Sequence, residues 1–238
     1  MDNALYATLT RQSGLMQEMR VVANNIANAN TTGFRTEGMV FAEHIAALGS
    51  RSDSLSMATG LVRDTLGAQG ALAQTGGTFD LAIEGDGFFQ VQTPQGLRLT
   101  RAGAFIPNEV GDLVTADGYQ VLDSGGAPIF VPQGVQTIAI APDGTLSADG
   151  QAVGQVGLVM PANPLAVTRE AGTLFDPGGA VDPAEDGRIL QGYVEESNVN
   201  PIQQISRMIE VQRAYELGQS FMDKEDARIR AVIQTLAR

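Results

Sequence analysis

The sequence contains no cysteine and no tryptophan, only one histidine, and few aromatic residues of any kind. Without cysteine the chain cannot form disulfides or thiolate metal sites, and its hydrophobic core must be mainly aliphatic. This absence does not fix the compartment, because a cysteine-free chain suits both reducing and oxidising surroundings. With 238 residues, of which 43% are hydrophobic, the chain can fold as one large domain or two small ones.

Long apolar runs are absent as well. No stretch approaches the roughly 18 residues that a transmembrane helix requires, so we expect no insertion into a lipid bilayer. The N-terminus has neither the basic and apolar segments nor the small-residue cleavage site of a secretory signal peptide. Any export of this chain is therefore expected to leave it uncleaved.

Positive charge is scarce, and the formal net charge is −12. Residues 37–194 account for all of it, with six arginines against 18 acidic residues, while residues 1–36 and 195–238 carry about +1 and −1. This balance argues against nucleic acid or an anionic membrane as a partner. Near-neutral ends can pack against copies of themselves, and an acidic middle keeps the chain in solution. The simpler alternative is that the acidic loops are only solvated.

A helix is predicted from residue 2 to about residue 28. Its apolar positions alternate spacings of four and three residues, which is typical of a coiled-coil seam. Caps and turns are favoured by the residues that follow, including Asn28, Asn30 and Gly33, so the helix should end there. The seam comprises Leu5, Leu9, Gln12, Met16, Met19, Ala23 and Ile26.

A second helix with the same spacing is predicted from about residue 201 to residue 237, with Asn198 or Asn200 as its cap. Some 35 helical residues exceed the typical length of about 11 to 12, which favours a coiled coil. Its seam comprises Ile205, Met208, Gln212, Tyr215, Gln219, Met222, Asp226, Ile229, Ile233 and Leu236. Two association-prone helices at the two ends describe a subunit that polymerises rather than an enzyme.

Between the helices the pattern changes twice. Residues 36–75 are weakly patterned and are expected to form an extended connector. Residues 76–191 alternate short strands with Asp-Gly and Gly-Gly turns, which predicts an antiparallel β domain. The expected fold class is therefore α+β. Its expected parts are an N-terminal helix in 1–35, the connector in 36–75, the β-rich domain in 76–191 and a C-terminal helix in 192–238.

No residue pattern predicts catalysis, a cofactor or a metal ion. The single histidine, His44, has no recognisable serine or cysteine partner. Asp80, Glu84 and Asp86 imitate the carboxylate pair of a glycosidase, but on an alternating strand and its turn they are more simply surface residues. Residues 143–150 lack the alternating acidic ligands of a calcium-binding loop.

Four closely spaced asparagines, Asn24, Asn25, Asn28 and Asn30, are more than one helix cap requires. Their amides can hydrogen-bond neighbouring backbone, and an elaborate helix stop is the simpler alternative. At this point the chain resembles the axial proteins of the bacterial flagellum, a family of rod and hook subunits. The resemblance covers most of the chain and rests on residues 24–35 (NNIANANTTGFR), 75–76, 79–89, 99–105, 111–115, 118–119, 192–199 and 208–216.

Sixteen residues represent this resemblance. They are Asn24, Asn25, Asn28, Asn30, Gly33, Phe34, Asp80, Gly85, Gly87, Phe88, Phe89, Ser197, Asn198, Gln212, Arg213 and Tyr215. The match is poorest over residues 45–65 and 155–187. Residues 194–196 (VEE) also depart from the pattern, because relatives often have a glycine before the serine-asparagine pair.

The resemblance implies a structural subunit of the basal-body rod that self-assembles through its terminal helices. It also implies export by the flagellar type III apparatus, and partners that are other rod proteins and further copies of the chain. The opening residues and modest length resemble the proximal, F-type rod subunits, with the distal, G-type subunits as the alternative. A soluble β-domain binding protein or hydrolase remains as an alternative of another class. The expected assembly contacts are Leu5, Leu9, Met16, Met19, Ile26, Ile205, Met208, Tyr215, Met222, Ile229, Ile233 and Leu236.

Overall fold

A computed structural model describes residues 2–46, 55–65, 67–170, 172–184 and 186–236. The chain divides into two compact units, which we describe separately. The helical unit comprises Met1–Ala27, Thr36–Leu66 and Val199–Arg238. The β unit comprises Asn28–Arg35 and Gly67–Asn198.

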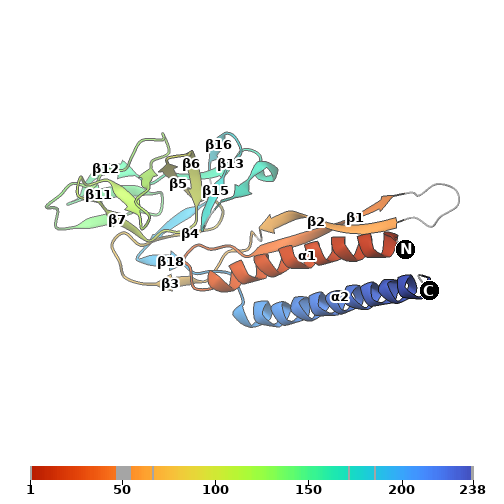
Figure 1. Cartoon of the computed structure of the whole chain (residues 1–238). Coiled ribbons are helices and arrows are strands. Elements are labelled where there is room, and N and C mark those ends of the chain that lie inside the picture. The colour runs from red at the N-terminus through yellow and green to blue at the C-terminus, as the bar shows by residue number, and fades with distance from the viewer. Residues whose placement is uncertain (1, 47–54, 66, 171, 185, 237–238) are drawn as a thin grey trace. The chain divides into compact units, whose positions relative to one another are not determined.

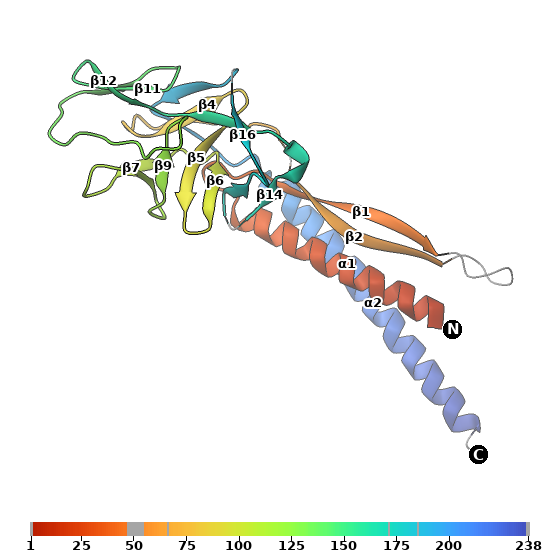
Figure 2. The same cartoon turned by 90° about the horizontal axis from the view of Figure 1, so that it is seen from above.

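The helical unit contains the two terminal helices and one pair of strands. Helix α1 spans Asp2–Ala27, helix α2 spans Pro201–Leu236, and strands β1 and β2 span Glu37–Ala46 and Leu55–Thr65. Helix α1 lies between the strand pair and α2 (Figures 1 and 2). The two helices run antiparallel and separate toward the C-terminal end of α2 (Figure 2).

Both ends of the sequence form the helices that the apolar spacing predicts. Helix α2 begins where Asn200 Oδ1 accepts hydrogen bonds from the backbone N–H groups of Ile202 and Gln203, at 3.1 and 3.2 Å. Pro201 occupies the first helical position, where its missing N–H costs nothing. Asn200 is therefore the cap, and Asn198 is not part of it.

The stretch predicted as an extended connector is largely paired β structure. Strands β1 and β2 pair antiparallel from Glu37↔Thr65 to Ala46↔Leu55, with a register irregularity between Val40 and Phe41. An irregularity of this kind shifts the two-residue alternation to the opposite face. The two strands therefore leave no single strand period in the sequence, which explains why this stretch is only weakly patterned.

The β unit consists of short antiparallel strands. The largest sheet follows the path β14-β15-β6-β5-β9-β8-β7, which is not the order of the strands along the chain. Strand β13 pairs with β5 in the same sheet, and β16 pairs with β13. Smaller sheets are β10-β11-β12, β17-β4 and β18-β3. The strand bounds are β3 Leu72–Gln74, β4 Leu81–Glu84, β5 Phe88–Thr93, β6 Gly96–Thr100, β7 Phe105–Pro107, β8 Leu113–Thr115, β9 Gln120–Leu122, β10 Ile138–Ile140, β11 Thr145–Ala148, β12 Gln151–Gln155, β13 Leu158–Pro161, β14 Thr168–Arg169, β15 Leu174–Asp176, β16 Val181–Pro183, β17 Arg188–Gln191 and β18 Tyr193–Glu195. A 3₁₀ turn, Pro164–Ala166, precedes β14.

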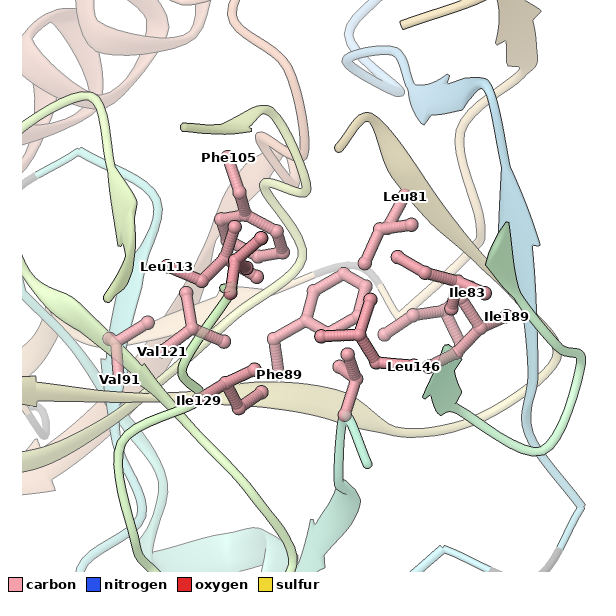
Figure 3. Close-up of a cluster of buried hydrophobic side chains, with 13 residues drawn as sticks. Leu81, Ile83, Phe89, Val91, Phe105, Leu113, Val121, Ile129, Leu146 and Ile189 are labelled. Atoms are coloured by element: carbon pink, nitrogen blue, oxygen red, sulfur yellow. The ribbon is translucent and has the colours of Figure 1, made fainter. Parts of the chain in front are cut away.

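The main core of the β unit is mostly aliphatic and contains one packed aromatic pair. Phe89 packs edge-to-face on Phe105, with ring centroids 5.1 Å apart, among buried leucine, isoleucine and valine side chains (Figure 3). Leu81, Ile83 and Leu146 are completely buried in this cluster. The central antiparallel β-rich region and the α+β class are confirmed.

Candidate functional site

Three polar contacts define how α1 lies against α2. The Gln12 side chain donates from Nε2 to the Tyr215 carbonyl at 2.9 Å. Glu18, which is 6% exposed, forms an ion pair with Arg207. Asn25 Nδ2 donates to Gln204 Oε1 at 3.3 Å. The residue number on α2 falls as the number on α1 rises, so the helices pair antiparallel.

The less exposed face of α2 is not quite the predicted seam. At every second position of the seam, the less exposed residue is the one just before the predicted residue. Seven of the less exposed positions alternate spacings of four and three residues: Gln204, Met208, Val211, Tyr215, Gly218, Met222 and Glu225. Ala214, beside Tyr215, is also half-buried. Met208, Tyr215 and Met222 were predicted, but Gln212, Gln219 and Asp226 are exposed. The prediction favoured Ile205 over Gln204 because it weighted hydrophobicity. Gln204 occupies the inner position because it has a hydrogen-bond partner there. A coiled coil as such stays a prediction.

Gly218 has a packing role that its helix propensity does not reveal. A Cβ atom at this position would lie 2.3 Å from Gln12 Nε2. The absence of a side chain therefore leaves room for the Gln12 amide to reach the Tyr215 carbonyl three residues earlier in α2. The roughly 1 kcal/mol that glycine costs in a helix is partly offset by this contact.

Several predicted assembly residues remain on the surface of the helical unit. Met19, Ile26, Met208, Tyr215 and Met222 are half-buried. The exposed ones are Leu9, Met16, Ile205, Ile229, Ile233 and Leu236. The Leu5 side chain lies outside the described residues. The assembly role of these residues stays a prediction.

The asparagine cluster does bind backbone, as one alternative predicted. Asn25 is 1% exposed, and its amide pairs with both backbone groups of Glu37. Asn25 Nδ2 donates to the Glu37 carbonyl at 2.8 Å, and the Glu37 N–H donates to Asn25 Oδ1 at 2.9 Å. The side chain thus mimics a neighbouring strand at the first residue of β1. Asn24 donates to the Glu37 carboxylate at 3.2 Å.

The remaining asparagines shape the turn after α1. Asn28 accepts at its carbonyl from the Thr31 N–H, and at Oδ1 from the Thr31 hydroxyl, both at 3.1 Å. Asn30 is exposed. Gly33 follows with φ +70°, and a Cβ there would lie 2.2 Å from the Ala102 backbone nitrogen. Only glycine fits this position, because both its conformation and its surroundings exclude a side chain.

The β unit buries a charge cluster built from signature segments. Glu195 is 1% exposed and pairs with Arg35 at 2.8 Å and with Arg101 at 3.2 Å. The Gly70 N–H donates to the same carboxylate at 3.0 Å, and the Gly33 N–H donates to the Glu195 carbonyl at 2.7 Å. We call Arg35, Arg101 and Glu195 the charge cluster. It connects segments that are far apart in sequence.

Neighbouring groups complete the surroundings of this cluster. Arg101 also donates to the Gly85 carbonyl at 2.9 Å. Burial lowers the pKa of the Arg101 guanidinium, an effect that Glu195 opposes and Arg35 reinforces. Arg169 donates to the Arg35 carbonyl and lies over the Phe34 ring, with its guanidinium carbon 4.5 Å from the ring centroid.

The other signature residues have structural positions. Asp80 accepts from the Thr75 hydroxyl. Gly85 and Gly87 both have positive φ in the turn before β5. Phe88 packs edge-to-face on Phe175, and Phe89 lies in the main core.

The C-terminal signature residues divide between the two units. Asn198 Nδ2 donates to the Ala68 carbonyl at 2.7 Å, and Ser197 is half-buried beside it in the chain. On α2, Gln212 and Arg213 are exposed, and the Tyr215 carbonyl accepts from Gln12.

Sequence reasoning missed the charge cluster as a unit. All three members stand inside the quoted motifs, but none was singled out. One feature of the sequence could have pointed to the charge cluster. Arg35 is the last residue of a 12-residue motif, residues 24–35, that contains no other charged residue. Gln12 was predicted as a seam position of α1, but its hydrogen bond to the Tyr215 carbonyl was not. Gly218 and the pair of Glu18 with Arg207 were not assigned a role.

A chemical centre is not evident in the part of the chain that the structure describes. There, no group of three or more histidine, aspartate or glutamate side chains is placed to hold a metal ion. Glu84 and Asp86 are exposed residues of a strand end and a turn. The His44 side chain lies outside the described residues.

Comparison with known proteins defines the class. Three family models match: "Flagella basal body rod protein" over residues 5–35, "Flagellar hook protein FlgE/F/G D1 domain" over 82–148, and "Flagellar basal body rod FlgEFG protein C-terminal" over 190–235. The chain belongs to the flagellar basal-body rod protein family.

Within the family, two F-type relatives are more similar to this chain than a G-type relative is. The flagellar basal-body rod protein FlgF of Caulobacter vibrioides is 40% identical, over 100% of this chain and 99% of its own length. FlgF of Mesorhizobium japonicum is 37% identical, over 99% and 98%. FlgG of Bacillus subtilis is 31% identical, over 98% of both chains. Rod proteins of this family are structural components of the basal body. In the described part of this chain, no helix is long and apolar enough to cross a membrane.

Proposed function

We propose that this chain is a structural, non-catalytic subunit of the proximal flagellar rod. It assembles by packing its terminal helices against further copies of itself and against other rod subunits. The observation that carries this proposal is the number of large apolar side chains exposed along α2. They include Ile202, Ile205, Ile209, Leu217, Phe221, Ile229, Val232, Ile233 and Leu236.

Apolar exposure on this scale is typical of a surface that is covered by a partner. The residues stand on a helix that already contacts α1 along another face, so they are not needed for the fold of the subunit. The two ends of the chain are also nearly neutral, whereas residues 37–194 carry the net charge of −12. Helices from several subunits can therefore approach without strong repulsion.

Export by the flagellar type III apparatus, without cleavage, is part of the same proposal. Helical ends that become fully ordered only when neighbours cover their apolar residues would polymerise late, because ordering a chain costs conformational entropy. The proximal rather than distal position is supported by the F-type relatives, at 35–40% identity against 30–31% for the G-type ones.

The test uses substitutions on the exposed apolar positions of both helices. Leu9 and Ile229 are 49% and 42% exposed, so Leu9→Asp and Ile229→Asp should leave the fold of the subunit intact. We expect either variant to be absent from purified hook-basal bodies, as read by antibody labelling in the electron microscope. Ile106, 56% exposed in the β unit, provides the matched control as Ile106→Asp.

Label on the membrane-proximal rod with the wild-type chain and with Ile106→Asp, but not with the helix variants, is the expected pattern. Label on the upper rod would instead assign the distal position. Normal incorporation of both helix variants would contradict assembly through the terminal helices.

A further inference from the structure

The helical unit carries an open groove between its two helices. The groove has a volume of about 420 Å³. Thr8, Arg11, Gln12 and Leu15 of α1 form one wall, and Ala214, Leu217, Gly218 and Phe221 of α2 form the other. Leu217 is 73% exposed, so the apolar surface of the groove is not covered by the subunit itself.

Gln12 gives this groove an unmet hydrogen-bonding requirement. Its side chain is 7% exposed, and its Nε2 is used by the Tyr215 carbonyl. Its Oε1 is buried and accepts no hydrogen bond from any described residue. A buried acceptor without a donor is unfavourable, so an occupant with N–H groups would be preferred to a purely apolar one.

The same chain carries an apolar segment with no helix opposite it. In each of the three contacts between α1 and α2, the residue numbers of the two partners add up to about 227. If this pairing continues to the start of α1, Asp2 lies opposite about residue 225 of α2. Residues 226–236, which we call the overhang, therefore extend past the start of α1 (Figure 2). Ile229, Val232, Ile233 and Leu236 are exposed there and share one helical face.

We infer that the groove of one copy of this chain receives the overhang of a second copy. The groove runs from Thr8 to Leu15, and the apolar face of the overhang runs from Ile229 to Leu236. Each span covers eight residues, with a rise of about 10 Å from its first residue to its last. The two surfaces therefore match in length and in apolar character.

The overhang also supplies donors for the unmet acceptor. Arg230 flanks its apolar face, and its ion pair with Asp226 uses only some of the five guanidinium N–H groups. A guanidinium from the second copy would bring N–H donors to the groove wall that contains Gln12.

The geometry of this contact is head-to-tail. The groove and the overhang are different surfaces of one subunit. When two copies bind, the copy that receives the overhang keeps its own overhang free, and the other copy keeps its groove free. A contact of this kind gives an open helical assembly unless the rotation between successive copies closes a ring. The inference rests on the proposed function as a rod subunit and assigns a site and an occupant to it.

Disulfide cross-linking tests the contact in the assembled rod. The chain has no cysteine of its own, so introduced thiols are unambiguous. Two copies are co-expressed in the native host, one with Leu217→Cys and the other with Ile233→Cys. Hook-basal bodies are then purified, oxidised and probed for disulfide-linked dimers of this chain. A disulfide forms only when the two Cα atoms approach within about 7 Å.

Ile202→Cys replaces Leu217→Cys in the matched control. Ile202 is an exposed apolar residue on the same helix, 77% exposed and outside the groove. We expect dimers from the 217 and 233 pair, at least tenfold above the 202 and 233 pair and above either variant alone. This outcome would establish the contact.

Three outcomes would overturn the inference. They are incorporation without cross-linking, equal cross-linking from the 202 control, and cross-linking of position 217 only to a different rod subunit. In each of these cases the chain is still in the rod, so the proposed function stands. Absence of even the wild-type chain from basal bodies would overturn the proposed function, and the inference with it.

Discussion

Replacing the buried carboxylate of the charge cluster provides the sharpest test of what stabilises the β unit. In Glu195→Gln the side chain keeps its size but loses its charge. Two guanidinium groups, on Arg35 and Arg101, are then left in a buried site without a counter-ion. The new amide NH₂ would also face groups that only donate hydrogen bonds.

The expected magnitude follows from the burial of the three side chains. Glu195, Arg101 and Arg35 are 1%, 4% and 5% exposed, so water cannot replace the lost interactions. Removing one partner of a buried ion pair typically costs about 3–5 kcal/mol. That is a large share of the roughly 5–15 kcal/mol that stabilises a folded protein.

Hydrogen exchange in strands β5 and β6 measures this loss in the β unit directly. Because about 1.4 kcal/mol corresponds to a factor of ten, exchange through global opening should accelerate by about 10² to several times 10³. Glu170→Gln is the matched control. Glu170 also pairs with an arginine, Arg98, at 2.8 Å, but it is 37% exposed. Water can reach Glu170, and the buried Arg98 keeps a second carboxylate, Asp176, at 3.7 Å, so loss of this pair should accelerate exchange less than about fivefold.

Equal effects of the two substitutions, or a loss below about 1 kcal/mol for Glu195→Gln, would refute the reasoning. Either result would mean that the buried guanidinium groups find other partners or water at little cost.

Two further predictions concern single contacts. Asn25→Ala removes both hydrogen bonds to the buried backbone of Glu37 and should cost about 2–4 kcal/mol, measured by urea unfolding followed by circular dichroism at 222 nm. Asn30→Ala, at an exposed turn position, should change stability by less than about 0.5 kcal/mol, and a similar loss in both variants would contradict a specific role for Asn25. The pKa of Asp143 lies below its ordinary value, because its carboxylate accepts from the Thr145 N–H at 2.9 Å and from the Thr145 hydroxyl at 3.0 Å. The stabilisation is therefore present above the ordinary aspartate pKa of about 3.9 and is lost as the pH falls through the lower, folded-state pKa. An NMR titration should show this depressed pKa in the wild-type chain and a partial upward shift in Thr145→Val, which removes the hydroxyl but keeps the backbone N–H. Unchanged titration in Thr145→Val would contradict a contribution from the hydroxyl.

The sequence alone determined the two terminal helices, the β-rich region between them and their order along the chain. Helical spacing is a local property, so both terminal helices could be predicted before any partner was known. The Asp-Gly turns were equally local. At Asp149 and Gly150, both residues have positive φ, as a tight hairpin turn between β11 and β12 requires. The motif resemblance likewise needed only the order of residues.

Tertiary structure decided which face of each helix is used and which distant residues meet. Gln204 and Gly218 lie on the inner face of α2 because Asn25 and Gln12 lie opposite them, and hydrophobicity alone favoured their apolar neighbours. Strands β1 and β2 pair with an irregular register, so neither strand shows a clear two-residue alternation of apolar and polar residues in the sequence. The charge cluster joins Arg101 to Glu195 across 94 residues, and a single sequence does not reveal an ion pair at that separation. Contacts between distant segments depend on three-dimensional packing, and for this reason only the structure could assign them.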